Sequence, residues 1–412
     1  MVASLGSRNM RVLHLCDSLN PAGLGGYESY LHYLSGVLDQ AAHESIITTQ
    51  KPSHNSTDSI EAEHYQIRYL EGNMLEARKW EYLTLPQEER HGAVKELFAP
   101  DDLEMNIELL VTELLSLIED FRPDVVHAHS TYVVFNRVLE HCRHESGIER
   151  LPLVATIHGL PKPLVLPDGT ETTDFEQLAA HCPFDTVLGV SDCVTSELQS
   201  HLPETVRDVR REYLGIDLDV FQPGGNPKQW DLAFMGRMER MKSVDMFPAL
   251  FGSLIERYPS LNIVMTGEGS CRRTIMEEFS ERGLDRNIDY LGVVPNDEVP
   301  SIIGQSKVFL YPSRREPFGL SIVEAMACQV PVVASNVFGP KEIITHNTDG
   351  ILVHPNRLHK IAESVLTLLG DFERRTSLGI SARRTIQRRF NIQDHAKRLL
   401  NLYGKLISEK KE

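Results

Sequence analysis

Two glutamates, Glu316 and Glu324, stand eight positions apart, and Pro-Phe-Gly-Leu follows the first of them directly. The apolar run 307–313 before them is typical of a buried strand. The proline and glycine then break the chain before a helix predicted over 320–327, so both carboxylates border a helix N-terminus, which attracts anions. Because a carboxylate accepts two hydrogen bonds from a vicinal diol, the pattern predicts a site for a nucleotide sugar. The plainer alternative is a helix-capping Glu316 and a solvated Glu324.

A second candidate group is cationic. Arg237 ends a predicted strand over 230–237, and Lys242 follows in the next loop. Both can reach a diphosphate at the strand ends, where arginine offers a planar fork and lysine a point charge. The alternative is that both side chains only solvate the surface.

A glycine-rich loop, 20–26, follows the first predicted strand. Backbone N–H groups at Gly25 and Gly26 can approach a phosphate or a sugar ring closely, because glycine has no side chain in the way. The loop does not have the G-x-G-x-x-G spacing of dinucleotide-binding proteins, and a tight turn between strand and helix is the alternative.

The elements that must position these residues are short apolar runs separated by helical patterns. Such runs indicate buried parallel strands with helices on both faces. The strands are predicted over 11–17, 124–130, 151–159 and 185–191 in the first half, and over 230–237, 261–269, 288–294, 307–313, 330–335 and 350–355 in the second. We interpret the chain as two doubly wound α/β domains, 1–213 and 214–390, followed by a C-terminal helix over 391–412. Residues 50–115 are interpreted as an elaboration of the first domain, with helices near Val94 and over 105–121. Ligands bind beyond the carboxyl ends of parallel strands, where the candidate residues lie.

The motifs together resemble retaining glycosyltransferases of family four, which have the GT-B fold: two Rossmann-like domains that face each other across a cleft. The resemblance rests on Glu316 and Glu324 within E-P-F-G-L-S-I-V-E-A-M-A, on Arg237 and Lys242 as G-R-x-x-x-x-K, on Gly267-Glu268-Gly269, on Gly25-Gly26, and on Thr156-Ile157-His158 as T-x-H. One position departs from the pattern, because Ser243 follows Lys242 where the family usually has glycine.

The resemblance implies a role for each matched residue. Arg237 and Lys242 would neutralise the leaving diphosphate in place of a divalent metal. Glu324 would bind the ribose, and Glu316 would hold the donor sugar. His158 would contact that sugar near the anomeric centre. The remaining donor contacts would come from backbone at Gly25, Gly26, Gly267, Val293, Phe318, Gly319 and Leu320, with Val293 reading the base.

The resemblance also implies a reaction and the course of the last helix. A hexose would pass from a donor, by family habit a UDP sugar, to a hydroxyl of an acceptor bound by the first domain, with retained anomeric configuration. No metal or other cofactor is expected. The C-terminal helix would cross back to the first domain.

Composition limits the class of protein. The chain of 412 residues is 41% hydrophobic and 24% charged, which is typical of a globular protein. No run approaches the roughly 18 apolar residues of a membrane helix, so we expect a soluble, cytoplasmic protein without an integral membrane segment. Its six cysteines form no C-x-x-C pair, which favours reduced thiols.

The charge is uneven. Residues 1–213 hold 16 Lys and Arg against 34 Asp and Glu, a formal charge of −18, whereas the remainder carries +2. Nucleic acid and anionic membranes are therefore poor partners for the first half. We expect a small soluble acceptor that is neutral or cationic, such as an amino sugar or aminocyclitol. The alternative is that the acidic residues only solvate a surface.

Other functions remain open. His127, His129 and His158 could form a metal site and make the protein a hydrolase, but no carboxylate cluster completes a ligand set. Asp217-Leu218-Asp219 has the form of a metal-binding D-x-D motif, but it lies in a predicted turn, so we interpret it as turn chemistry. An epimerase acting on a nucleotide sugar, a phosphorylase and a catalytically silent sugar-nucleotide binder are further alternatives.

Overall fold

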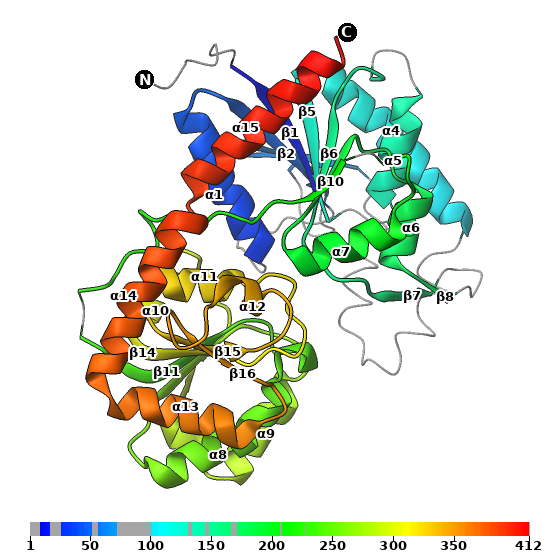
Figure 1. Cartoon of the computed structure of the whole chain (residues 1–412). Helices are drawn as coiled ribbons and strands as arrows, with labels where there is room; N and C mark the ends of the chain where they lie inside the picture. The colour runs from blue at the N-terminus through cyan, green and yellow to red at the C-terminus, as the bar shows by residue number, and fades with distance from the viewer. Residues whose placement is uncertain are drawn as a thin grey trace, which may run out of the picture. The chain divides into compact units, whose positions relative to one another are not determined.

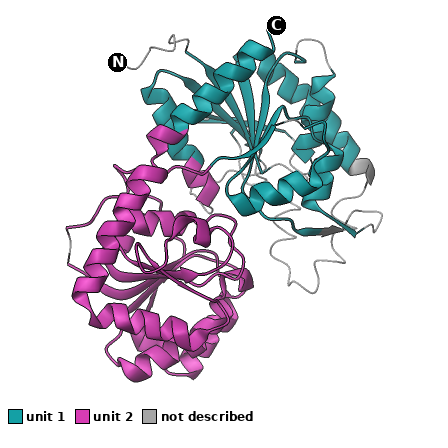
Figure 2. Ribbon diagram, in the orientation of Figure 1, with its two compact units in different colours: residues 1–19, 31–212, 396–412 teal, residues 20–30, 213–395 magenta. Residues whose placement is uncertain are grey.

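The computed structural model of the chain (Figure 1) describes residues 9–16, 26–51, 57–71, 100–130, 134–144, 148–165, 171–206, 208–225 and 227–411. The chain forms two compact units (Figure 2). Unit 1 comprises residues 1–19, 31–212 and 396–412, and unit 2 comprises residues 20–30 and 213–395.

A mostly parallel sheet forms the centre of unit 1. Its strands lie in the order β10-β9-β6-β5-β1-β2-β4-β3, and all pairs are parallel except β3 with β4. Their bounds are β1 (Arg11–Cys16), β2 (Glu44–Gln50), β3 (Ser59–Glu61), β4 (Gln66–Leu70), β5 (Val125–His129), β6 (Leu153–Ile157), β9 (Thr186–Gly189) and β10 (Asp208–Arg211). A separate antiparallel pair is formed by β7 (Pro163–Val165) and β8 (Glu171–Thr173). Strand β1 is followed by β2 on one side of the sheet centre, and the neighbouring β5 is followed by β6 on the other side. The carboxyl ends of β1 and β5 therefore form the topological switch point of this sheet.

Helices cover this sheet through their apolar faces. They are α1 (Gly26–Gln40), α4 (Pro100–Phe121), α5 (Val134–Arg143), α6 (Asp174–Ala180), α7 (Asp192–His201) and α15 (Ile392–Glu409). In α1, Leu31, Leu34 and Leu38 recur at helical spacing and are fully buried. Helix α15 begins in unit 2, and from Ala396 onward it belongs to unit 1, where Tyr403 is fully buried.

Unit 2 has a parallel sheet in the order β13-β12-β11-β14-β15-β16. The strands are β11 (Trp230–Met235), β12 (Ile263–Thr266), β13 (Ile288–Tyr290), β14 (Ser306–Tyr311), β15 (Val332–Ser335) and β16 (Ile351–Val353). The chain runs outward from β11 to β13 and then returns to β14 on the other side of β11. The carboxyl ends of β11 and β14 therefore form the switch point of this sheet, where ligands of open α/β sheets bind.

Figure 1 shows helices on both sides of the unit 2 sheet, with α10 and α11 on one side and α8, α9 and α13 on the other. The α-helices are α8 (Phe247–Arg257), α9 (Arg272–Glu281), α10 (Val299–Gly304), α11 (Leu320–Ala327), α12 (Pro340–Ile343), α13 (Leu358–Gly370) and α14 (Phe372–Arg389). Short 3-10 helices are η1 (Arg240–Lys242), η2 (Val244–Met246) and η3 (Asp285–Asn287). Stacked rings of Phe247, Phe251 and Phe279 fill the core beside β11.

The predicted fold class is confirmed, and each predicted strand overlaps an observed one. The helix predicted over 320–327 is α11, and the helix predicted over 105–121 is α4, which begins at Pro100. The helix expected near Val94 lies outside the described residues. The prediction missed β2, β3, β4, β7, β8 and β10. In β2, Thr48 and Thr49 are polar yet fully buried and interrupt the apolar run. All six cysteines are free thiols. In the described part of the chain, no helix has the length and apolarity required to cross a membrane.

Candidate active site

The structure brings two predicted site residues of unit 2 into direct contact. Lys242 Nζ donates hydrogen bonds to Glu316 Oε2 and, at 2.8 Å, to the hydroxyl of Tyr311. The ammonium also lies 5.1 Å from the centre of the Tyr311 ring. Lys242 ends η1 after β11, and Glu316 lies in the loop after β14, so the pair occupies the switch point of the sheet.

This ion pair is buried. Lys242 is 8% exposed and Glu316 is 6% exposed. Burial alone would lower the pKa of Lys242, but the charge of Glu316 and the hydrogen bonds to Glu316 and Tyr311 raise it above its usual value. For Tyr311, burial and the nearby Glu316 raise the pKa to about 12. The site therefore holds a charged lysine, an opposed carboxylate and a neutral phenol.

Helix α11 contributes its N-terminus and Glu324. Gly319 precedes the helix with φ 114° and ψ 58°, a left-handed conformation that favours glycine. The N–H groups of Ile322 and Val323 donate to the carbonyl of Gly319 at 3.0 and 3.2 Å, whereas a helix has no internal partner for the N–H groups of its first two residues, here Leu320 and Ser321. Glu324, one turn further, is 9% exposed, and its carboxylate forms no side-chain hydrogen bond within the described chain. Burial raises the pKa of Glu324 to about 7.

The ring of Phe318 holds the loop between these residues in place. Phe318 is 3% exposed and packs against Tyr213 and Phe390, with ring centres 6.1 and 5.8 Å away. The N–H of Gly339 donates to the Glu316 carbonyl at 3.0 Å. The Phe318 ring is therefore occupied in packing, and the contact of its backbone with the donor stays a prediction.

Main-chain hydrogen bonds join the loops after β11, β12 and β13. Met238 N donates to Glu268 O at 2.8 Å, and Gly267 N donates to Gly292 O at 2.7 Å. Gly267 has φ +113°, and a Cβ on it would lie 2.1 Å from the carbonyl oxygen of Gly236. Only glycine fits this close approach of two backbones.

Other predicted residues border these loops. Arg237 follows β11 and is exposed; its guanidinium lies 3.9 Å from the sulfur of Met241 and forms no ion pair among the described residues. Leu291 and Val293, after β13, are 43% and 44% exposed. Gly26, at the start of α1, is also part of unit 2, and a Cβ on it would lie 3.0 Å from the Leu320 side chain. Gly25 lies outside the described residues.

His158 belongs to unit 1, where it follows β6. Its ring is half-buried, and its backbone N–H donates to Ser130 Oγ at 3.2 Å. His129 lies beside it, with Nδ1 3.4 Å from His158 Nε2. The D-x-D motif is a turn, as interpreted from sequence, because Asp217 Oδ1 accepts the N–H groups of Asp219 and Val220 at 2.8 and 3.3 Å.

The sequence reasoning missed Tyr311 and His14. Tyr311 is the last residue of β14 and touches the Lys242 ammonium. Its position at a strand end, beside two predicted loops, was a usable signal. His14 lies within β1, and only its register against β5 shows that it meets other imidazoles.

Ser243 occupies the position where a glycine was expected, with φ 62° and ψ 23°. It is fully buried, and its hydroxyl has no hydrogen-bond partner in the described structure. Ser243→Gly should raise the free energy of unfolding by about 1 kcal/mol. A left-handed conformation costs an L-residue about 1–2 kcal/mol, but glycine loses more backbone entropy on folding, which offsets part of this gain. Denaturant unfolding measures the change.

Ser335→Gly is the matched control for that variant. Ser335 is also a buried serine whose hydroxyl lacks a partner among the described residues, but it lies in β15. Glycine weakens a strand interior, so this variant should lose stability. Equal effects at the two positions would show that backbone conformation at Ser243 is not the cause.

Known proteins resemble the chain over nearly its whole length. A family model described as Glycosyltransferase Family 4 matches residues 24–220, and one described as Glycosyl transferases group 1 matches residues 216–385. An uncharacterized glycosyltransferase of Methanocaldococcus jannaschii is 25% identical over 340 residues, which are 78% of this chain and 83% of that protein.

Two solved structures show the same fold. The sucrose-phosphate synthase of Thermosynechococcus elongatus matches with a TM-score of 0.77 and 21% identity, over 97% of this chain and 100% of the other. Anabaena HepE, in a complex with UDP and glucose, matches with a TM-score of 0.69 and 17% identity, over 96% of this chain and 100% of the other.

Two Rossmann-like units, with a lysine and two carboxylates at the switch point of the second, define the class of GT-B glycosyltransferases. Because the two family models follow each other along residues 24–385, the chain belongs to glycosyltransferase family four. It is thus a retaining hexosyltransferase that uses a nucleotide sugar. The roles of individual residues stay predictions.

Proposed function

We propose that this enzyme transfers a hexose from a UDP sugar to a hydroxyl of a small soluble acceptor, without a metal ion. Lys242 and Arg237 neutralise the leaving diphosphate, and Glu316 holds the donor sugar with the backbone amides of Phe318, Gly319 and Leu320. Glu324 binds the ribose, Val293 contacts the base, and Gly25, Gly26 and Gly267 allow close approach of backbone to the donor. His158 contacts the sugar near the anomeric centre.

One observation supports the assignment of the donor site. The buried Lys242–Glu316 pair lies beside the N-terminus of α11, at the switch point of unit 2. A buried ion pair is a weak source of stability, so its presence in a loop favours a ligand-binding role. The cation supplies charge for phosphate, the carboxylate accepts sugar hydroxyls, and the helix N-terminus favours anions. The exposed apolar side chains of Leu291 and Val293 offer a surface for a base.

The proposed charge of the acceptor rests on the formal charge of the first half of the chain, which is −18 over residues 1–213. An acidic unit repels anionic acceptors and favours neutral or cationic ones, such as an amino sugar or an aminocyclitol. Turnover with a lipid phosphate, together with none on soluble sugars, would contradict this part of the proposal.

The direct test is the thermal stability of the purified enzyme with UDP, GDP, ADP and their hexose conjugates, in the presence of EDTA. A ligand that binds only the folded state raises the melting temperature, so UDP compounds should give a selective rise. A selective rise with GDP or ADP would correct the donor. No rise with any nucleotide, together with lower stability after chelation, would contradict metal-independent transfer.

The buried Glu324 predicts a pH dependence of donor binding. Burial raises the pKa of Glu324 to about 7 from 4.5, and the ionised form is the better acceptor for a ribose diol. UDP affinity should therefore fall about tenfold for each pH unit below 7 and level off above 7. Calorimetric titrations between pH 5.5 and 8.5 measure this, and Glu324→Gln should bind weakly without this slope.

Stability should change in the opposite direction. The folded pKa of Glu324 lies above its unfolded value, so the folded protein holds the proton more tightly between pH 4.5 and 7. Its contribution to stability thus rises as pH falls through this window and is lost as pH rises through it. The difference between wild type and Glu324→Gln isolates this contribution from that of other groups.

A further inference from the structure

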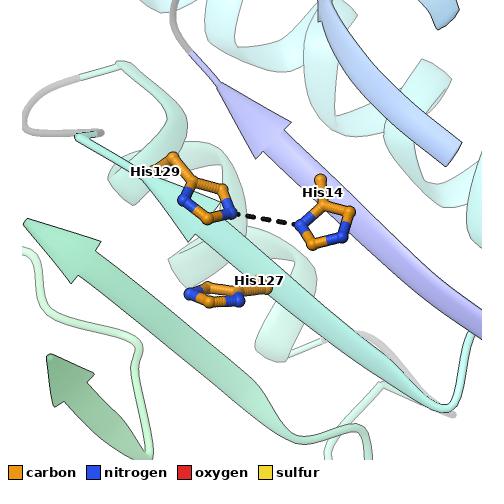
Figure 3. Close-up of side chains that lie close together, drawn as sticks. All are labelled: His14, His127 and His129. Atoms are coloured by element: carbon orange, nitrogen blue, oxygen red, sulfur yellow. Dashed lines mark hydrogen bonds between the residues drawn. The ribbon is translucent and has the colours of Figure 1, made fainter. Parts of the chain in front are cut away.

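Three imidazoles lie together on one face of the unit 1 sheet, near the carboxyl ends of β1 and β5 (Figure 3). In the strand register, His14 lies opposite His127, and Cys16 lies opposite His129. Residues two apart on a strand share a face, so His14, His127 and His129 point to the same side. All three side chains are fully buried. Buried polar rings at a switch point need an explanation, because they replace apolar packing.

Hydrogen bonds divide these rings into two sets. His127 has partners of its own, since Nδ1 meets the Tyr403 hydroxyl and Nε2 lies 2.7 Å from Thr156 Oγ1. His14 Nδ1 lies 3.1 Å from His129 Nε2, and His129 Nδ1 lies 3.4 Å from His158 Nε2. A chain of three imidazoles therefore runs from the core at His14 to the half-buried His158.

The surroundings of His14, at the inner end of this chain of imidazoles, indicate which nitrogen of each ring carries the proton. His14 Nε2 is buried and has no hydrogen-bond partner among the described residues. Burial lowers the pKa of His14 to about 3, so the ring is neutral and carries one proton. A buried N–H without a partner is rarer in proteins than an acceptor without one, so the proton lies on Nδ1. His14 then donates to His129 Nε2, which leaves the proton of a neutral His129 on Nδ1, where it is donated to His158.

We propose that His14 and His129 are positioning residues that hold His158 as the neutral tautomer with its proton on Nδ1 and its Nε2 turned inward. This inference rests on the proposed contact of His158 with the donor sugar. In this tautomer, Nδ1–H is the hydrogen-bond donor that His158 offers to a sugar oxygen. The neutral ring also carries no positive charge. A positive charge there would repel the one that develops at the anomeric carbon during transfer.

A metal ion is the competing explanation. Ligand atoms of His14, His127 and His129 lie within 4.8 Å of one another. Zinc needs a free lone pair from each ring, whereas both nitrogens of His127 and both of His129 are within hydrogen-bond distance of a partner. The protein's own hydrogen bonds thus account for the cluster, and metal binding becomes an outcome of the test.

The test is the tautomer of His158 in the full-length enzyme labelled with ¹⁵N-histidine, with its signals assigned by loss in His158→Ala. We expect nitrogen shifts of the Nδ1–H tautomer in the wild type. In His129→Leu this preference should disappear, and kcat should fall about 10- to 100-fold with little change in the donor KM, as for other residues that orient a functional group. His129→Asn, whose amide can donate to His158, should restore the tautomer and most of kcat.

His127→Asn is the matched control, because His127 is as buried as His129 and lies on the same strand but does not belong to the chain of imidazoles. It should lower thermal stability and leave the tautomer of His158 unchanged. If His129→Leu does not fold, the wild-type spectrum remains decisive, since an Nε2–H tautomer overturns the proposal. Binding of one Zn²⁺ by the wild type, abolished in His14→Leu, also overturns it.

The outcome also separates this inference from the proposed function. An Nε2–H tautomer together with an inactive His158→Ala would refute the imidazole chain and leave the contact of His158 with the donor standing. Full activity of His158→Ala would refute that contact, and the chain of imidazoles would then have no role in catalysis.

Discussion

Glu316→Gln should lower kcat by roughly 30- to 1000-fold in a protein that still folds, since loss of one charge-assisted contact in a closed site costs about 2–4 kcal/mol of transition-state stabilisation. The amide keeps the size of the side chain but cannot accept the same pair of sugar hydroxyl hydrogen bonds. Initial rates at saturating donor, measured well below the melting temperature, test this expectation.

The same variant should also be less stable, because Lys242 loses its buried counter-charge. Breaking one side of a buried pair costs about 3–5 kcal/mol, and the neutral amide keeps part of the hydrogen bonding. The matched control is Asp231→Asn, which breaks the Lys307–Asp231 pair of 2.7 Å in the same unit. That control should lose stability and keep its kcat. Normal turnover in a folded Glu316→Gln protein would remove Glu316 from the site.

Lys242→Met should have the largest effect on donor use. The variant removes the buried cation proposed to neutralise the diphosphate, and kcat/KM should fall about 100- to 1000-fold, as when other preorganised charge-stabilising groups are removed. It also leaves Glu316 buried without its partner, at a cost of about 3–5 kcal/mol of stability. Steady-state kinetics measures the fall in kcat/KM, denaturant unfolding measures the loss of stability, and UDP titration shows whether the donor also binds more weakly.

A double variant separates stability from function. Lys242→Met combined with Glu316→Leu replaces the pair by apolar groups, and such replacement is often neutral for stability. We expect the double variant to recover the stability lost by Lys242→Met and to recover no activity. Lys307→Met is the control for loss of a paired lysine elsewhere in unit 2. Donor affinity unchanged in a folded Lys242→Met protein would contradict the assigned role of Lys242.

Much of this arrangement follows from the sequence. Continuous apolar runs predicted the parallel strands, and the strand-end rule placed Arg237, Lys242 and Glu316 at one edge of unit 2. The start of α11 at Leu320 was predicted because proline and glycine leave the chain no helical alternative before it.

The partners of these residues could not be predicted in the same way. Lys242 and Glu316 are separated by 74 positions, and their contact depends on the 3-10 turn over 240–242, for which the sequence has no clear pattern. The imidazole chain depends on the register between β1 and β5, which only tertiary packing fixes. Strand β2 was missed because burial of its threonines overrides their polarity.

The main-chain hydrogen bonds among the loops after β11, β12 and β13 divide the donor site into two parts that can change separately. Backbone atoms of Gly236, Met238 and Gly267 fix the shape of the loops, so that shape does not depend on the side chains beyond β13. The side chains of Leu291 and Val293, in the loop after β13, are 43% and 44% exposed, so they contribute little to the packing of these loops. If Val293 contacts the base as proposed, substitutions at these two exposed positions should alter the preferred base while the loop scaffold persists, which would be a route to a new nucleotide donor.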